Sequence, residues 1–392
     1  MDKVTVIKGK HPGVSFVEVR FSGEYIDSIQ RPDTNQREIC SEKDEKIITP
    51  GFIDIQVNGF AGIDFNHPNF RADDLVLACE SILQTGVTRF CPTLITGSYG
   101  QIFNSIQEIR EACERYSLVR SMVLGIHLEG PYINPEDGPR GAHPRLHVSD
   151  PDWDEFHRLY ELSHGLLCMV TVAPERPGGI RFIQKATELG LVVGLGHCAP
   201  APDIIEAAVN AGAILSTHLG NGAHNMLPRH ANYVQKQMAH DRLMASIICD
   251  GHHLPDYFIK NLVRAKGKSR VILISDATAA AASPPGRYTM GECDIEAGDD
   301  GVLRLPDTPY LTGSTLTMDK AVINCARSAG ITLASAINMV TVNPAKLFNS
   351  ISGKLEPGQR ADLVLFRHIG RRIQINEVYL AGRLLYSVQE NP

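Results

Sequence analysis

Four titratable side chains follow apolar runs in the middle of the chain, and their types match a hydrolytic metal site. Glu129, His197, His218 and Asp276 each stand where such a run ends. A carboxylate with two imidazoles is a known catalytic zinc set, and it leaves a position for water or substrate. The metal would lower the pKa of bound water and polarise a carbonyl, while Asp276 would take up the proton. The sequence thus predicts three ligands, Glu129, His197 and His218, and an acid/base, Asp276.

Each of these residues alone has a simpler explanation. A lone histidine or aspartate at a strand end is more often a cap or a satisfied hydrogen-bond partner. The recurrence of such groups at successive strand ends favours a functional set. Other motifs are weak: Gly267–Ser269 resembles the end of a phosphate-binding loop, but Leu262 stands where its first glycine belongs. No GxGxxG follows a predicted strand, so no nucleotide cofactor is expected.

The elements that would position these residues alternate regularly along the chain. Apolar runs predict strands at Gly51–Val57, Thr88–Leu94, Val123–Leu128, Cys168–Ala173, Val192–Gly196, Ile214–His218, Ala245–Cys249 and Val271–Ser275. One-sided apolar stripes predict helices at Asp73–Gln84, Ile102–Tyr116, Ile180–Leu189, Pro202–Ala211 and Tyr257–Lys266. This order predicts a (β/α)₈ TIM-like barrel, with a doubly wound sheet as the alternative. In a barrel the carboxyl ends of the strands meet at one rim, where active sites lie.

Both ends of the chain carry short strand-like segments and no helical periodicity. Val4–Ile7 and Val17–Arg20 alternate near the start, and Ala361–Phe366, Ile373–Ile375 and Val378–Leu380 do so near the end. Two β-rich ends around an α/β middle predict one small β domain built from both. The predicted division assigns residues 1–48 and 349–392 to that domain and residues 49–348 to the catalytic barrel.

Composition narrows the class of protein. The 392 residues carry a formal net charge of −6 and no long basic run, so neither nucleic acid nor an anionic membrane is expected as a partner. No stretch of about 18 uninterrupted apolar residues occurs, so no membrane span is expected. The nine cysteines form no CxxC pair, which is typical of reduced thiols and predicts a cytoplasmic protein.

Ten segments, taken in order, resemble the N-acetylglucosamine-6-phosphate deacetylases of the amidohydrolase superfamily. They are Pro50–Asp54, His127–Pro131, Gly196–His197, Thr217–Leu219, Asp250–His253, Ser275–Thr278, Leu311–Ser314, Asn343–Lys346, Gly353–Gly358 and Ala361–Val364. The resemblance covers nearly the whole chain and keeps order and spacing. It implies a metal-bearing barrel with a small β-sandwich, and the same roles for Glu129, His197, His218 and Asp276.

The resemblance also bears on the number of metals. Many amidohydrolases carry His-x-His at the end of the first strand and bind two ions, whereas this chain has Gln56-Val57-Asn58 there. Since Gln56 has no imidazole, the resemblance implies one divalent metal. Zinc is the expected ion, with iron, manganese or cobalt as alternatives.

Further contacts follow from the resemblance alone. His143 is expected near the acetyl carbonyl as a catalytic group, and His253 is expected to contact the sugar. The Leu311–Ser314 turn, through Leu311 and Gly313, is expected to contact the substrate; its simpler interpretation is a turn before a helix. The expected activity is deacetylation of N-acetylglucosamine 6-phosphate.

The phosphate contact is the part in which this chain departs from the family pattern. The backbone amides of Asn221 and Gly222 are expected to hold phosphate oxygens, and Arg229 is expected to reach the phosphate from the partner subunit of a homodimer. The family's arginine is usually followed by an acidic residue, proline and glycine, but here His230–Tyr233 follows. An amidohydrolase for an unphosphorylated or different N-acyl substrate therefore stays open, as does a barrel that serves only as a binding protein.

Overall fold

The computed structural model describes residues 4–12, 16–31, 46–308, 310–350 and 352–388. Eight strands run in parallel through its centre, in the spatial order of the chain. They are β5 (Phe52–Val57), β8 (Val87–Ile95), β9 (Ile126–Glu129), β10 (Leu167–Val172), β11 (Val192–Leu195), β12 (Leu215–Ser216), β13 (Met244–Ile248) and β14 (Val271–Ile274).

Backbone bonds between the last and first strands bring the sheet round into a barrel. The amide of Asp276 donates to the Gln56 carbonyl over 3.1 Å, and the amide of Asn58 donates to the Ala277 carbonyl over 2.7 Å. The predicted (β/α)₈ barrel is confirmed, and the alternative of an open doubly wound sheet is wrong.

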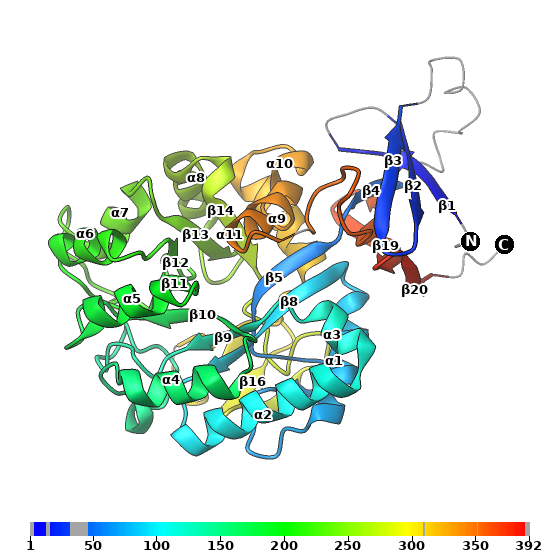
Figure 1. Ribbon diagram of the computed structural model, residues 1–392. Coiled ribbons are helices and arrows are strands. Elements are labelled where there is room, and N and C mark those ends of the chain that lie inside the picture. The colour runs from blue at the N-terminus through cyan, green and yellow to red at the C-terminus, as the bar shows by residue number, and fades with distance from the viewer. Residues whose placement is uncertain (1–3, 13–15, 32–45, 309, 351, 389–392) are drawn as a thin grey trace.

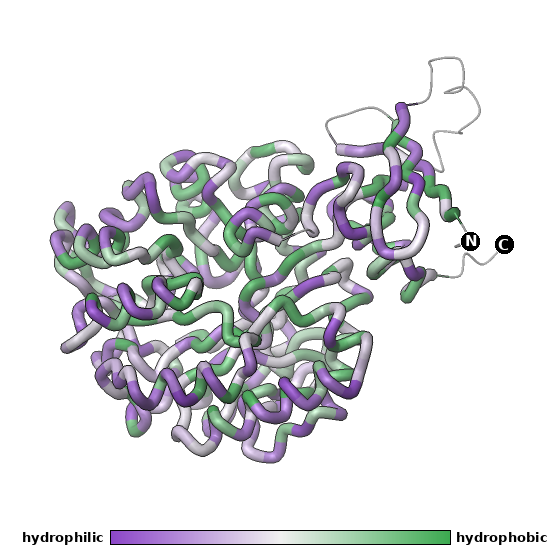
Figure 2. The backbone as a smooth tube through the Cα atoms, in the orientation of Figure 1, coloured by the Kyte–Doolittle hydropathy of each residue, from purple (hydrophilic) through white to green (hydrophobic). Residues whose placement is uncertain are grey.

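Helices cover the outside of this barrel (Figure 1). They are α1 (Ala72–Leu83), α2 (Tyr99–Arg115), α3 (Ser117–Met122), α4 (Trp153–Leu162), α5 (Gly179–Glu188), α6 (Pro202–Asn210), α7 (Tyr233–Ala239), α8 (Asp256–Lys266), α9 (Met318–Ala329), α10 (Leu333–Asn338) and α11 (Val342–Leu347). Figure 2 shows the apolar backbone stretches at the centre and the hydrophilic ones on the outer helices, as expected for helices with one buried face. Among the described residues, no helix is both long and apolar enough to cross a bilayer.

The two ends of the chain meet in one seven-stranded sheet, in the order β20-β19-β18-β4-β1-β2-β3. Its strands are β1 (Thr5–Lys10), β2 (Phe16–Ser22), β3 (Tyr25–Gln30), β4 (Ile47–Pro50), β18 (Leu363–Ile369), β19 (Arg372–Leu380) and β20 (Arg383–Ser387). Figure 1 shows this sheet beside the barrel, built from the first and the last described strands of the chain. Side chains from both halves share a core that includes Val19, Phe21, Leu363 and Tyr379. The predicted small β domain from both termini is confirmed, and we propose a domain boundary near residue 50, where β4 ends.

A three-stranded antiparallel sheet lies between the last barrel strand and α9 and was not predicted. It consists of β15 (Gly286–Met290), β16 (Cys293–Ala297) and β17 (Leu303–Arg304), and we call residues 286–308 and 310–313 the flap. A buried carboxylate attaches it to the barrel: Asp64 accepts hydrogen bonds from the Gly291 amide over 2.8 Å and from the Thr289 hydroxyl over 3.0 Å. Asp64 belongs to β7 (Ile63–Asp64), which pairs with β6 (Gly59–Phe60) just after the first barrel strand.

Candidate active site

Three of the predicted residues converge on one point at the carboxyl rim of the barrel. Glu129 ends β9, and His197 and His218 follow β11 and β12. The Nε2 atom of His218 lies 2.9 Å from Oε1 of Glu129 and 3.0 Å from Nε2 of His197, and the remaining His197–Glu129 pair is 3.3 Å apart. All three side chains are buried. Parallel strands therefore deliver the three groups to one site.

This donor set fits a divalent metal better than it fits hydrogen bonds alone. One proton can link only two of the three atoms, whereas a metal accepts lone pairs from all of them. Tetrahedral coordination at about 2.0–2.1 Å separates ligand atoms by roughly 3.4 Å, close to the observed spacings. The Nδ1 atom of His197 lies 2.8 Å from the Pro139 carbonyl oxygen, which fixes Nδ1 as the protonated nitrogen and leaves Nε2 free for a metal.

Glycines allow two loops to close around His197. A Cβ atom on Gly222 would stand 2.9 Å from Nδ1 of His197, and one on Gly141 would stand 3.2 Å from its Cε1. Both glycines also have positive φ angles, 55° and 58°. The loops after β9 and β12 can therefore approach the ring only because these positions lack side chains.

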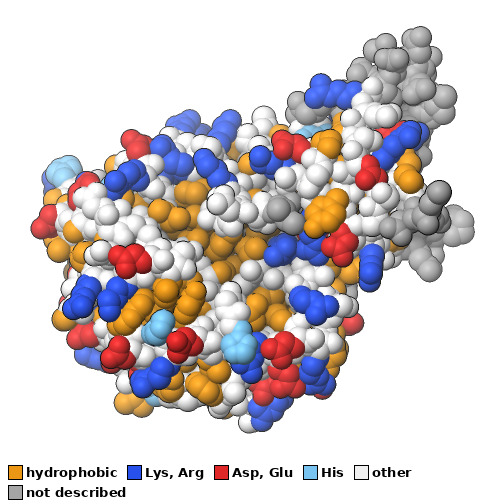
Figure 3. Space-filling view, viewed as in Figure 1, with side chains coloured by type: hydrophobic (Ala, Val, Ile, Leu, Met, Phe, Trp, Pro, Cys, Tyr) orange, Lys and Arg blue, Asp and Glu red, His pale blue; other side chains and the backbone are white. Residues whose placement is uncertain are grey.

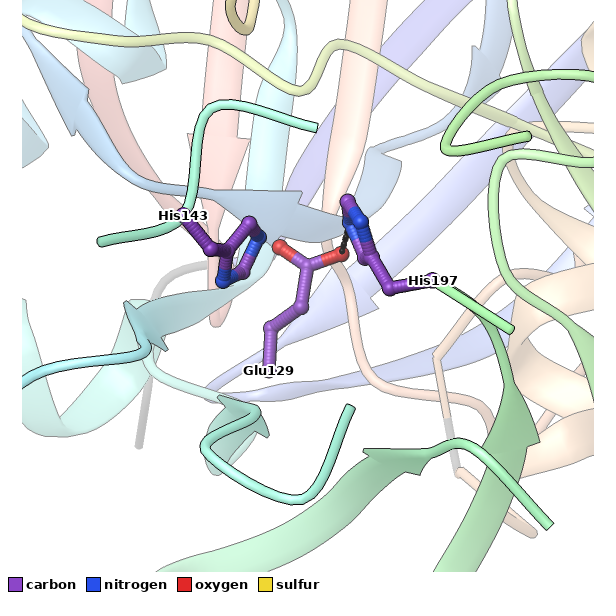
Figure 4. A group of neighbouring side chains, drawn as sticks. All are labelled: Glu129, His143 and His197. Atoms are coloured by element: carbon purple, nitrogen blue, oxygen red, sulfur yellow. Dashed lines mark ion pairs between the residues drawn. The ribbon is translucent and has the colours of Figure 1, made fainter. Parts of the chain in front are cut away.

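His143 lies beside the three predicted ligands and faces the same centre. Figure 4 shows its ring and that of His197 on either side of the Glu129 carboxylate. Their ring centroids are 4.2 Å apart, and one ligand atom from each of Glu129, His143 and His197 falls within 4.8 Å of the others. Nε2 of His218 lies within 3.0 Å of both Glu129 Oε1 and His197 Nε2, so we propose His218 as the third ligand, with His143 beside the set.

The proton position on His143 follows from its neighbours. Its Nδ1 accepts the backbone N–H of Thr96 over 3.4 Å and lies 2.8 Å from the Thr96 hydroxyl. Burial, reinforced by His197, holds the pKa of His143 well below its usual range, so the ring is neutral. A neutral ring that accepts at Nδ1 carries its hydrogen on Nε2. His143 is therefore a hydrogen-bond donor at that nitrogen.

Asp276 lies next to the same cluster and is held by two amide side chains. Its Oδ1 accepts from Asn58 Nδ2 over 2.7 Å and from Gln56 Nε2 over 3.1 Å. The same Gln56 amide also donates to Oε1 of Glu129 over 2.9 Å. Gln56 and Asn58 thus occupy the first strand end with hydrogen bonds to both carboxylates, where imidazoles would offer ligands for a second metal.

The two carboxylates ionise differently because their surroundings differ. Burial, together with the neighbouring Glu129 charge, raises the pKa of Asp276 to about 6. Burial would also raise the pKa of Glu129, but hydrogen bonds to His197 and His218 hold it well below its usual range. Glu129 is therefore a permanent anion, whereas Asp276 is suited to exchanging a proton near neutral pH.

A cavity of about 280 Å³ opens onto these groups. Most of the predicted substrate contacts line it, namely Asn221, Gly222, His253, Leu311 and Gly313, together with His143, Glu129, His197, His218 and Asp276. Thr312, within the predicted Leu311–Ser314 turn, also lines the cavity, whereas Asn225 and the flap residues Met290 and Tyr310 line it without having been predicted. The flap has no metal-ligand or catalytic pattern that could have pointed to them.

Arg229 is the one predicted contact that the structure places elsewhere. Its side chain is exposed and does not line the cavity. Among the described residues that do line the cavity, none is a lysine or an arginine. The described part of a single chain therefore brings no permanent cation to this pocket. Figure 3 shows acidic and basic side chains interspersed over one face of the molecule, with no basic surface.

Comparisons with known proteins agree with the fold and the site. The model of the amidohydrolase family matches residues 47–385. The chain is 33% identical to N-acetylglucosamine-6-phosphate deacetylase from Bos taurus, over 88% of this chain and 84% of that protein. It is 31% identical to N-acetylgalactosamine-6-phosphate deacetylase from Escherichia coli O157:H7, over 88% and 89%.

A solved structure extends this similarity to the whole chain. It is a mutant N-acetyl-D-glucosamine-6-phosphate deacetylase from Mycobacterium smegmatis in complex with N-acetyl-D-glucosamine-6-phosphate. It superimposes with a TM-score of 0.88 and 25% identity, covering 98% of this chain and all (100%) of that chain. The chain therefore belongs to the amidohydrolase family, and within it to the N-acetylglucosamine-6-phosphate deacetylases.

Proposed function

We propose that the protein hydrolyses the acetamido group of N-acetylglucosamine 6-phosphate, giving glucosamine 6-phosphate and acetate. The observation that carries this proposal is the convergence of Glu129, His197, His218 and Asp276 on one cavity. The chain's membership among the deacetylases supports the same substrate class.

Glu129, His197 and His218 would hold one divalent metal, with zinc as the expected ion and iron, manganese or cobalt as alternatives. When bound, such an ion supplies an acidified water and a Lewis acid for the carbonyl oxygen. The single site follows from Gln56 and Asn58, whose amide nitrogens donate to carboxylates.

Asp276 moves the proton in this reaction. Both amide donors bind its Oδ1, so Oδ2 is the oxygen left for proton transfer. The ionised carboxylate takes a proton from the attacking water and then returns it to the amine nitrogen as the C–N bond breaks. His143 donates from Nε2 to the carbonyl oxygen, where negative charge develops.

The phosphate group requires contacts from loops and, we propose, from a second subunit. Asn221, Gly222 and His253 all line the cavity. The Asn221 N–H donates to the His218 carbonyl over 2.9 Å, so the backbone amide proposed for the phosphate is that of Gly222. Arg229 is exposed on the loop after β12. We propose a homodimer in which Arg229 reaches the phosphate bound by the partner. The free cysteines among the described residues support a reducing, cytoplasmic location.

Acetate release from three sugars tests this substrate assignment. We expect turnover of N-acetylglucosamine 6-phosphate and a kcat/KM at least a hundredfold lower for N-acetylglucosamine, since each hydrogen bond to a charged group contributes roughly 1.5–3 kcal/mol and the phosphate makes several. The third sugar is N-acetylgalactosamine 6-phosphate, because the E. coli relative carries that name. Preference for this sugar would reassign the stereochemistry, and equal activity on the unphosphorylated sugar would contradict the phosphate assignment.

A further inference from the structure

We propose that Asp250 is a positioning residue for the substrate's phosphate: it holds His253 so that Nε2 faces the pocket, and it supports a positive charge on that ring. The inference rests on the proposed function and assigns a role to a residue that the reaction scheme does not use. It concerns binding and specificity, since neither side chain belongs to the cluster around Glu129.

The two side chains form a partly buried pair at the end of a barrel strand. Asp250 follows β13 by two residues, and His253 lies in the loop before α8. Oδ2 of Asp250 lies 2.7 Å from Nδ1 of His253, and the side chains are 11% and 10% exposed. A carboxylate accepts only, so Nδ1 carries a hydrogen and Nε2 is the nitrogen presented to the cavity that His253 lines.

Asp250 also shapes the local backbone, and the two roles use different oxygens. Its Oδ1 accepts the backbone N–H groups of His252 and His253 over 2.8 and 2.9 Å. This turn fixes the carboxylate, which in turn fixes the ring. Hydrogen bonds from these two amides and from the ring, with a Coulombic contribution from the ring, lower the pKa of Asp250 against the effect of burial, so the carboxylate is charged.

The pair matters because the pocket has few sources of positive charge. No lysine or arginine is among the described residues that line the cavity. His197 and His218 point at Glu129, and His143 is a neutral donor aimed at the same centre. Among the described residues that line the cavity, His253 is thus the remaining basic side chain, and we propose that the Asp250 carboxylate behind its ring supports a positive charge there when a phosphate binds.

The Asp250→Asn variant tests the contact with His253 while keeping the hydrogen bonds that form the turn. The amide oxygen can still accept the two backbone N–H groups, but the amide nitrogen then donates to Nδ1 of His253. The ring keeps a hydrogen on Nε2 and loses its positive charge. The donor to the anionic phosphate then changes from a charged ring to a neutral one, so KM for N-acetylglucosamine 6-phosphate should rise roughly tenfold with kcat within about twofold. The KM increase should be smaller for N-acetylglucosamine, which has no phosphate for His253 to bind.

The control is Asp241→Asn, a carboxylate-to-amide change on a side chain that is 82% exposed and does not line the cavity. It should match wild type on both sugars, and His253→Asn should show at least the KM increase of Asp250→Asn. An Asp250→Asn variant with wild-type KM would overturn the proposal, because Asp250 would then serve only the turn. An Asp250→Asn variant with equal losses of kcat/KM on both sugars and a lower melting temperature would also overturn the proposal.

A second readout separates this inference from the deacetylase assignment. Nitrogen-15 spectra of histidine-labelled protein, titrated with inorganic phosphate, report the protons on His253 without any turnover. Protonation of both ring nitrogens on phosphate binding in wild type, but not in Asp250→Asn, supports the pair even if no acetate is released from the sugar. A His253 signal that phosphate leaves unchanged in wild type overturns it, whatever the activity.

Discussion

Asp276 carries the proton chemistry, and its surroundings set the acid side of the pH profile. Burial and the Glu129 charge raise the pKa of Asp276 to about 6, and a bound cation opposes this shift. A general base must be ionised, so kcat/KM should be constant above that pKa and fall tenfold per pH unit below it, with the midpoint at or below about 6. Profiles from pH 4 to 8 at saturating metal check this. A profile in which activity rises as the pH drops from 7 to 5 would contradict the role of Asp276.

Gly222 keeps space for the ring of His197. In Gly222→Ala the new Cβ would stand 2.9 Å from Nδ1 and 3.3 Å from the Pro139 carbonyl oxygen that Nδ1 contacts. Disturbing such a supporting bond typically lowers metal affinity roughly 10–100-fold. Metal content after dialysis against a graded chelator measures the effect.

The matched control for that variant is Gly165→Ala. Gly165 also has a positive φ, 86°, but a Cβ there would meet nothing within 4 Å. The Gly165→Ala variant should bind metal like wild type. It has the backbone strain of an alanine at positive φ without a contact to His197, so it shows the effect of strain alone. Equal metal affinity in both variants would show that the approach of Gly222 to His197 does not matter.

The sequence identified the titratable residues of the site but not the side chains that hold them by hydrogen bonds. Glu129, His197 and Asp276 could be identified because each ends an apolar run, and the geometry of parallel strands then brings them together. Gln56 was recognised only as the absence of a histidine. Its hydrogen bonds to two carboxylates depend on a distance across the barrel, and no local pattern encodes that distance.

At the scale of elements, the buried carboxylate of Asp64 holds the flap in its position over the barrel. Oδ2 of Asp64 accepts both flap donors, and Oδ1 accepts the Asn66 backbone N–H over 2.9 Å. The amide nitrogen of an asparagine would therefore face a backbone N–H in either orientation and leave a buried donor without an acceptor, at a cost of about 1–3 kcal/mol. Because Met290 and Tyr310 line the cavity, we expect Asp64→Asn to raise KM roughly tenfold.

Steady-state kinetics and melting temperature together test this attachment. Asp294→Asn, on the exposed side of β16, is the control and should change neither quantity. An unchanged KM in Asp64→Asn would mean that the flap keeps its place without this carboxylate.

Element prediction succeeded where apolar periodicity is strong. All eight barrel strands lie within the predicted runs or within a few residues of them, even β12, which is only Leu215–Ser216. The flap was missed because its hairpin turns on Gly291-Glu292, a weaker turn signal than Asn-Gly or Asp-Gly. β19 was predicted as two short pieces, although it forms one strand, Arg372–Leu380.

At the scale of the whole molecule, the barrel and the sheet from both termini could be predicted from the order of elements, because parallel strands need helical crossovers. Subunit assembly could not be predicted in this way, since it depends on surface fit. The exposed Arg229 is the test of assembly. Arg229→Ala alone should raise KM for the phosphorylated sugar roughly tenfold or more, because the variant cannot form the charged hydrogen bond from the guanidinium to the phosphate.

Mixing two defective variants shows whether Arg229 acts across a dimer. An Arg229→Ala chain retains Asp276, and an Asp276→Asn chain retains Arg229, so a mixed dimer has one complete site. Refolding the two together should give more activity at low substrate than either variant, and more than their average. Activity equal to that average, in a preparation shown to contain mixed dimers, would place Arg229 outside the partner's site.

The most direct measurement is acetate release by metal-loaded wild type and Asp276→Asn, with the metal content of each sample determined in parallel. The arrangement of Glu129, His197, His218 and Asp276 predicts about one divalent ion per chain in both proteins. It also predicts a kcat for the variant lower by at least roughly a thousandfold, within the usual range of about 10²–10⁴ for removal of an acid/base, because Asp276 serves both proton transfers. Comparable acetate release by a fully metal-loaded Asp276→Asn would contradict the mechanism.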